Sequence, residues 1–326
     1  MIESVEDDYI GEAFSSELDE LIPRTRDDAV ERLKQGRLFR LLDSIIKFIL
    51  ARPENEAICR DFLNAVIFPD GSREFTLIEV LGSDTPPARL RGRGSRIDLR
   101  GVLDDDSMLN VEIQINYDAA HASRAVYYWS LVHTNQLESG DLYKETSRTV
   151  SINVLGFDML KLEKNFCNSY SIRNDGSSRV LSDDLKIIFI ELPKYIRELK
   201  KPGRKLKSKL ERWLCFLVGL EDEHMPNMAE EAPLIGTAIE QEKLFIVDER
   251  LRMAYIDDLM DMYSERRREA RAMKLEKDKL ELVEENKKHL RNERRTAVKF
   301  AELGLTIEEI AVTMGVEDED ARNFLA

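Results

Sequence analysis

The chain has 326 residues, 34% of them charged, and a formal net charge of −14 at pH 7. This length allows one large domain with extensions or two domains, and no run of 18 apolar residues suggests a membrane span. The negative charge argues against a surface that coats nucleic acid generally, because such binding depends on neutralising phosphates.

Residues 1–36 contain eleven acidic residues and four basic ones. Few apolar residues recur at helical spacing there, so we expect a partly ordered leader. Two interpretations are open, a solvated tail and an acidic segment that shields a basic groove. We expect no signal peptide, because a basic block followed by an apolar block is missing.

Two helices and a strand are expected next. Apolar residues recur every three or four positions from Leu38 to Ile49, and Pro53 begins a second helical pattern that ends near Phe68. The pattern of residues 75–81 predicts a strand. Residues 82–95, rich in Gly, Pro and Arg, are expected to form a loop.

The following segment predicts a hairpin of two strands, residues 96–100 and 110–115, joined by an acidic turn at residues 104–106. In the second strand polar and apolar residues alternate, which places Asn110, Glu112, Gln114 and Asn116 on one face. A hairpin centred on Asp105 sets Asp98 opposite Glu112 and Arg96 opposite Gln114. Opposed side chains share a face, with Cβ atoms about 5 Å apart, so the two acids lie side by side.

Two carboxylates at that separation repel one another unless a cation lies between them. Oxygen ligands of this kind favour Mg²⁺ or Mn²⁺, which makes Asp98 and Glu112 candidate metal ligands. Gln114 is a third polar group on the same face. The alternative is an amphipathic hairpin whose outer face carries one acid on each strand.

Residues 117–137 are expected to form a helix that brings Arg124 and Tyr128 to one face. This pair either supports the metal site or contacts phosphate, or it packs at the boundary between helix and sheet. Residues 148–157, 169–173 and 186–192 have the pattern of strands. The order of helices and strands predicts a mixed α/β sandwich.

Two basic clusters contrast with the acidic total. Residues 194–212 hold nine Lys or Arg and two Glu, and a group of arginines between residues 89 and 100 adjoins the acid pair. Such clusters are either solvated faces or phosphate contacts. The candidate contacts are Arg93, Lys200, Lys201, Arg204 and Lys205.

Residues 243–299 predict a long charged helix with an apolar seam. The seam is interrupted by Arg266, Glu269, Glu276 and Lys287. Because a strong coiled coil keeps its seam apolar, we expect a helix held by ion pairs four residues apart that forms a homodimer only weakly.

Residues 303–326 have the pattern of a helix-turn-helix, with a capping box of Thr306 and Glu309 and a turn at Gly315. Residues 317–320 are all acidic, and phosphates would repel a helix that begins with them. We therefore expect a small structural or protein-interaction module.

Several motifs, in order along the chain, resemble the PD-(D/E)XK nuclease family transposases, also called the Rpn (recombination-promoting nuclease) family. They are Asp43–Lys47, Phe62–Val66, Ser95–Leu99, Val111–Gln114, Arg124–Ser130, Gly140–Tyr143, Val150–Leu155 and Glu191–Lys194. The chain departs from the family pattern at Ile46, where Phe is usual, and at residues 92–94, where many members have Lys. Gln114 stands where the wider superfamily has Lys, as is common in this family.

The resemblance implies a restriction-endonuclease-like α/β core with a mixed sheet flanked by helices, followed by a long charged helix and a small helical end. It also implies a metal-dependent DNA endonuclease, linked to recombination or transposition, in which Asp98, Glu112 and the carbonyl of Ile113 hold Mg²⁺ or Mn²⁺. Gln114 would orient the attacking water. The accessory residues would be Asp43, Lys47, Arg96, Arg124 and Tyr128.

The competing hypothesis is a nuclease fold without catalysis that binds DNA or a protein. In either case we expect four parts: a leader at 1–36, a nuclease-like domain at 37–220, a linker and long helix at 221–300, and a small end at 301–326. The widely spaced Cys59, Cys167 and Cys215 fit reduced thiols in a cytoplasmic protein.

Overall fold

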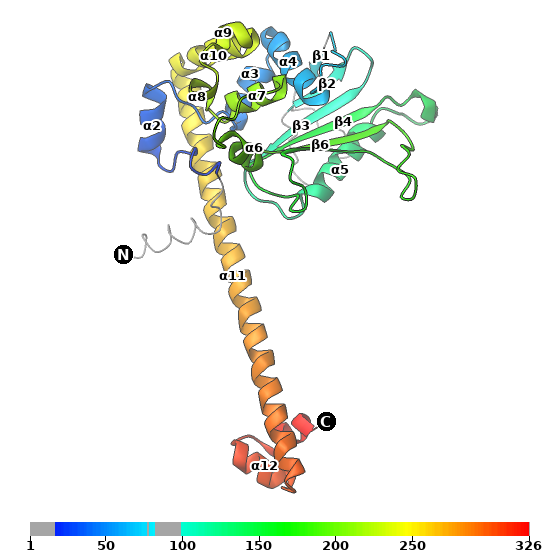
Figure 1. Cartoon of the computed structure of the whole chain (residues 1–326), viewed down its shortest axis with the longest axis vertical. Helices are drawn as coiled ribbons and strands as arrows, with labels where there is room; N and C mark the ends of the chain where they lie inside the picture. The colour runs from blue at the N-terminus through cyan, green and yellow to red at the C-terminus, as the bar shows by residue number, and fades with distance from the viewer. Residues whose placement is uncertain (1–16, 77, 82–98, 326) are drawn as a thin grey trace. The chain divides into compact units, whose positions relative to one another are not determined.

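In the described part of the chain, six strands form one mixed sheet in the order β1-β2-β3-β4-β6-β5 (Figure 1). The computed structural model describes residues 17–76, 78–81 and 99–325. The central pairs β3–β4 and β4–β6 are parallel, and the pairs β1–β2, β2–β3 and β5–β6 are antiparallel. The strands are β1 (Ile78–Leu81), β2 (Leu99–Leu103), β3 (Met108–Gln114), β4 (Thr149–Leu155), β5 (Cys167–Tyr170) and β6 (Leu185–Glu191).

Helices precede, interrupt and follow the sheet. They are α2 (Arg26–Lys34), α3 (Asp43–Leu50), α4 (Glu56–Ile67), α5 (His121–Thr134), α6 (Leu192–Leu199), α7 (Lys209–Leu217), α8 (Glu221–His224), α9 (Met228–Glu231), α10 (Pro233–Val247), α11 (Glu249–Glu302), α12 (Ile307–Met314) and α13 (Asp318–Leu325). Within the described ranges, no helix combines the length and the apolar character that a membrane crossing requires. The predicted α/β fold, a mixed sheet flanked by helices with a long C-terminal helix, is confirmed.

The hairpin of β2 and β3 has the predicted register. Leu99 pairs with Val111 and Arg100 pairs with Asn110, as expected for a hairpin centred on Asp105. The Leu103 N–H donates to the carbonyl of Ser107 at 2.9 Å and closes the turn. The predicted pairing is therefore confirmed for the described residues, whereas Asp98 lies outside them.

The two faces of the sheet have different chemistry. One face packs against α3, α4 and α7 in the large apolar core, and the other lies under α5 (Figure 1). The face toward the large core carries Leu109, Val111, Ile152, Val154, Ile188 and Ile190. The face under α5 carries buried polar residues on β3 and β4, namely Asn110, Glu112, Ser151 and Asn153. This polar layer is the setting of the candidate site.

The first strand begins later than the expected start at residue 75. Phe75 is buried, and its backbone is already paired with the side chain of Asn64 on α4. The Phe75 N–H donates to Asn64 Oδ1 at 2.8 Å, and Asn64 Nδ2 donates to the Phe75 carbonyl at 3.0 Å. These two bonds use the groups that a strand neighbour would need, so Phe75 is not part of β1, which spans Ile78–Leu81.

The helix predicted over residues 243–299 is two helices, because Asp248 interrupts it. The Asp248 carboxylate accepts hydrogen bonds from the N–H groups of Arg250 and Leu251 at 2.8 and 3.1 Å. An acidic side chain in this position caps a new helix rather than continuing the old one. α10 therefore ends at Val247, and α11 begins at Glu249.

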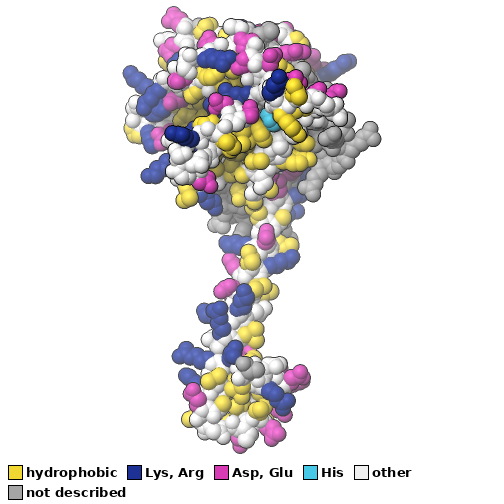
Figure 2. Space-filling view, turned by 90° about the vertical axis from the view of Figure 1, so that its right-hand side faces the viewer, with side chains coloured by type: hydrophobic (Ala, Val, Ile, Leu, Met, Phe, Trp, Pro, Cys, Tyr) yellow, Lys and Arg dark blue, Asp and Glu magenta, His cyan; other side chains and the backbone are white. Residues whose placement is uncertain are grey.

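The described part divides into two compact units, residues 17–266 and residues 267–325. In the second unit α12 and α13 pack with the end of α11 around Ala297, Ile310 and Ala321. The Thr306–Glu309 capping box and the left-handed turn at Gly315, with φ of 69°, are confirmed. On the face of the molecule that Figure 2 shows, acidic and basic side chains are mixed.

A buried ion network ties α8 and α10 to the large core. The Arg40 side chain, 6% exposed, donates to Glu221 at 2.5 and 2.8 Å and to Glu242 at 3.0 Å. It also donates to the Phe216 carbonyl and lies 4.2 Å from the centroid of the Phe216 ring. Burial raises the pKa of Glu242, while Arg40 opposes that rise. One cation thus serves two buried carboxylates.

We expect Arg40→Met to lower the free energy of unfolding by about 3–5 kcal/mol, because it leaves two buried carboxylates without their cation. Urea denaturation followed by circular dichroism measures this loss. Arg37→Met is the matched control, since Arg37 is an exposed arginine three residues away. A loss below about 1 kcal/mol in the Arg40 variant would mean that the network contributes little.

Candidate active site

The site is organised around one buried acid. Glu112, in the middle of β3, is 1% exposed and points to the face that α5 covers. Arg124, in the second turn of α5, donates one guanidinium NH₂ group to the Glu112 carboxylate and to Gln114 Oε1, the latter at 3.1 Å. Its other NH₂ group donates to Asp118 at 3.2 Å. One guanidinium therefore joins Glu112 and Gln114 on β3 to Asp118, in the segment that precedes α5.

Burial and charge act in opposite directions on Glu112. Burial raises the pKa of its carboxyl group, and the positive charge of Arg124 opposes that rise. Glu112 Oε2 is buried and has no hydrogen-bond partner among the protein atoms of the described ranges. A free, water-excluded carboxylate oxygen is a suitable ligand for a hard divalent cation.

Gln114 is held at both ends of its amide. Its Oε1 accepts from Arg124, and its Nε2 donates to the carbonyl of Asn116 at 3.0 Å. The amide therefore has a defined orientation beside the Arg124 guanidinium. Each end keeps capacity for one more hydrogen bond.

Beneath α5 a chain of buried polar groups continues the site across the sheet. Asn110 and Asn153 both donate to the Ser151 hydroxyl, at 3.1 and 3.2 Å, and Asn153 Oδ1 lies 3.2 Å from His121 Nε2. Burial lowers the pKa of His121 to about 4, with Arg124 acting in the same direction, so the imidazole is neutral at pH 7. Glu112 and Asn153 are direct neighbours in the parallel register of β3 and β4.

Our sequence reasoning missed His121, Ser151 and Asn153. A signal was present, because Ser151 and Asn153 are two polar residues spaced by two in the otherwise apolar run from Val150 to Leu155. That spacing places both on one face of a strand. The facing strand and the covering helix could not be identified without the fold.

The structure brings only some of the predicted residues together. Tyr128 is 7% exposed, and its ring centroid lies 5.7 Å from the Arg124 guanidinium carbon, while Ile113 follows Glu112 on β3. Asp43 and Lys47 form an ion pair with each other at 2.9 Å on α3. Arg93, Arg96 and Asp98 lie outside the described residues. In the ranges that are described, no three His, Cys, Asp or Glu side chains form a group that could hold a metal.

Most of the basic run after β6 is paired with carboxylates. Lys200 pairs with Glu20 at 2.7 Å, Lys201 pairs with Glu198, and Arg204 pairs with Glu211 at 2.8 Å. Lys205 is exposed. The leader contributes two of the carboxylates, since Glu17 also bonds Arg197 at 2.7 Å. These contacts agree with the interpretation that acidic residues of the leader shield a basic surface.

The motif Glu191–Lys194 has a structural role. The Lys194 ammonium donates to Glu191 at 2.6 Å and to the carbonyls of Leu160 and Glu163 at 2.7 and 2.8 Å. Glu191 in turn accepts the N–H groups of Met159 and Leu160. Both side chains are buried, so this motif fastens the loop after β4 to the end of β6.

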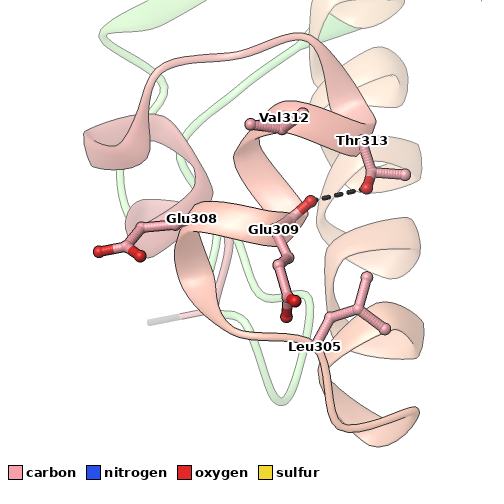
Figure 3. Close-up of a pocket in the computed structure, with 5 residues that line it drawn as sticks. All are labelled: Leu305, Glu308, Glu309, Val312 and Thr313. Atoms are coloured by element: carbon pink, nitrogen blue, oxygen red, sulfur yellow. Dashed lines mark hydrogen bonds between the residues drawn. The ribbon is translucent and has the colours of Figure 1, made fainter.

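An open groove in the C-terminal unit does not suit the same chemistry. It encloses about 450 Å³ and is lined by Leu305, Glu308, Glu309, Val312 and Thr313 (Figure 3). Its polar lining includes two carboxylates, which would repel a phosphodiester. The buried cluster under α5 therefore remains the candidate site.

Comparison with known proteins identifies the family. A family model described as PD-(D/E)XK nuclease family transposase matches residues 40–269, which include the whole sheet, α5 and most of the large core. Searches of curated proteins and of solved structures give no match. The match covers more than half of the chain and contains Glu112, Gln114 and Arg124. The chain belongs to the PD-(D/E)XK nuclease family transposases.

Proposed function

We propose that this protein is a divalent-metal-dependent DNA endonuclease, linked to recombination or transposition, whose centre is Glu112 under α5. The observation that carries the proposal is the buried Glu112 carboxylate, which has one oxygen held by Arg124 and the other without a partner among the described residues. Asp98, Glu112 and the carbonyl of Ile113 are the proposed ligands. A bound Mg²⁺ or Mn²⁺ would supply Lewis acidity and an activated water for phosphodiester hydrolysis.

Arg124 and Gln114 are the residues of the proposed site that would contact the phosphate and the attacking water. The Arg124 side chain is 34% exposed, so it can reach a phosphate while its inner face remains on Glu112. In this proposal Arg124 supplies the positive charge that a Lys at position 114 supplies elsewhere in the superfamily. The Gln114 amide, fixed by Arg124 and Asn116, orients a water or a phosphate oxygen.

The second candidate is a protein of the same fold that binds DNA or another protein without cutting. One observation favours it, because Arg124 already neutralises Glu112, the one proposed acidic ligand within the described residues. A divalent ion would have to share Glu112 with that guanidinium. The two candidates differ in whether divalent ions produce any strand cleavage.

The three cysteines are free thiols, and Cys59 and Cys215 are buried. This supports the cytoplasmic location that we propose for the activity.

Glu112→Gln should reduce Mg²⁺- or Mn²⁺-dependent nicking of supercoiled DNA to background, because the variant keeps the shape of the side chain and removes its charge. It should also abolish the rise in melting temperature that Mn²⁺ gives to the parent. Asp98→Asn should behave in the same way.

Glu79→Gln, an exposed acid on β1, is the matched control and should cut like the parent. Parental cutting by the Glu112 variant would remove Glu112 from the site. If the parental protein nicks DNA with none of Mg²⁺, Mn²⁺, Co²⁺ or Ni²⁺, the result would favour the second candidate, a protein that binds without cutting.

Gln114→Leu should slow single-turnover nicking by about 10²-fold with little change in DNA affinity, since one oriented hydrogen-bonding group is removed. Gln114→Lys alone should also be slow, because its ammonium would lie beside the Arg124 guanidinium. If Arg124 supplies the charge of the site, Gln114→Lys should accelerate cutting in an Arg124→Gln background. Absence of this rescue would assign Arg124 a structural role only.

Reversing Lys200, Lys201 and Lys205 to Glu should weaken DNA binding and lower the salt slope of log affinity by about one for each phosphate that is no longer neutralised. Arg204 is left intact because its side chain is only 14% exposed and pairs with Glu211. The control reverses Arg24, Lys34 and Arg37, three exposed cations near α2, with the same change in net charge. Equal DNA affinities of the two triple variants would mean that the cluster is a solvated face that does not contact DNA.

A further inference from the structure

A long stretch of α11 carries exposed apolar side chains. Every residue from Arg271 to Asn292 is exposed, and Leu280 and Leu290 are 65% and 54% exposed. Figure 2 shows hydrophobic surface among the charged side chains along this stretch. Several apolar side chains exposed to this extent along one helix indicate a surface that binds a partner.

The apolar residues on one side follow the spacing of a coiled-coil seam. Steps of three and four residues lead through Glu276, Leu280, Val283, Lys287, Leu290 and Arg294. The next position of the series, Ala297, is already buried by α12 and α13. The free seam therefore ends at Arg294, and Glu276 and Arg294 flank its exposed apolar residues Leu280, Val283 and Leu290.

The charges on the seam discriminate between the two orientations of a second copy. In a parallel pair the three charged positions would each face the same residue of the other copy, so that acid meets acid and base meets base. In an antiparallel pair centred on Glu285, Glu276 faces the partner's Arg294 and Leu280 faces the partner's Leu290. Val283 then faces the partner's Lys287, whose aliphatic stem can cover it while the ammonium reaches water.

We propose that α11 forms an antiparallel, two-fold symmetric pair with a second copy of this chain over the seam from Glu276 to Arg294. The surface is self-complementary, as a two-fold interface requires. The seam covers about 28 Å of helix at 1.5 Å per residue, which is short for a stable dimer and fits a concentration-dependent one. The charged residues that interrupt the seam set the orientation of the pair.

Cysteine cross-linking of the full chain tests the register. In a Cys167→Ser background, which leaves only the two buried cysteines, chains with Leu280→Cys are mixed with chains with Leu290→Cys under mild oxidation. We expect a disulfide-linked dimer from the mixture and none from Leu280→Cys alone. Leu282→Cys mixed with Leu290→Cys is the control and should not cross-link, because Leu282 lies off the seam. Cross-linking of Leu280→Cys to itself would overturn the antiparallel register.

Charge exchange provides an independent measurement. Glu276→Arg should raise the dimer dissociation constant by at least about tenfold, because it sets two arginines against each other at both ends of the pair. Adding Arg294→Glu to the same chain should restore the parental value. Sedimentation equilibrium measures both. A parental protein that remains monomeric up to about 100 μM would contradict the proposal. A double variant whose dimer dissociation constant is no lower than that of Glu276→Arg would also contradict it.

Discussion

The site depends on the pairing of one buried acid with one cation that comes from a different element. Glu112 on β3 is almost completely shielded from water, and a carboxylate in such surroundings is costly unless a positive charge is near. Arg124 on α5 provides that charge and also bonds Gln114 and Asp118. The position of α5 over the sheet is thereby linked to the side chains that carry the proposed chemistry.

The rest of the fold keeps this pairing in place. The sheet has an apolar face that joins the large core, and its other face holds polar groups against α5. Because β4 and β6 run parallel to β3, Asn153 lies beside Glu112 and connects to the neutral His121. Glu191, Lys194 and Asn64 lie in segments that resemble family motifs, yet their contacts hold loops and the start of the sheet rather than the site. Some residues in the segments that resemble family motifs therefore have a structural role and no part in the proposed chemistry.

Local rules predicted the parts of the structure that depend on neighbouring residues. The hairpin of β2 and β3 follows from alternating side chains and an acidic turn, and the capping box at Thr306 follows from a spacing of three residues. What could not be predicted depends on contacts between distant segments. Arg124 and Glu112 were both candidates, but nothing in their spacing indicated that they bond each other. The pairing of Lys200 with Glu20, 180 residues earlier, is of the same kind.

The most direct test of the proposed metal site is anomalous diffraction from a crystal soaked in Mn²⁺. If Glu112 is a metal ligand, as suggested by its carboxylate oxygen that has no hydrogen-bond partner among the described residues, an anomalous peak should lie at coordination distance, about 2 Å, from Glu112 Oε2. The same soak of Glu112→Gln crystals should show no peak at this place. A parental map without a peak near Glu112, with Mn²⁺ bound elsewhere or not at all, would contradict the proposed active site.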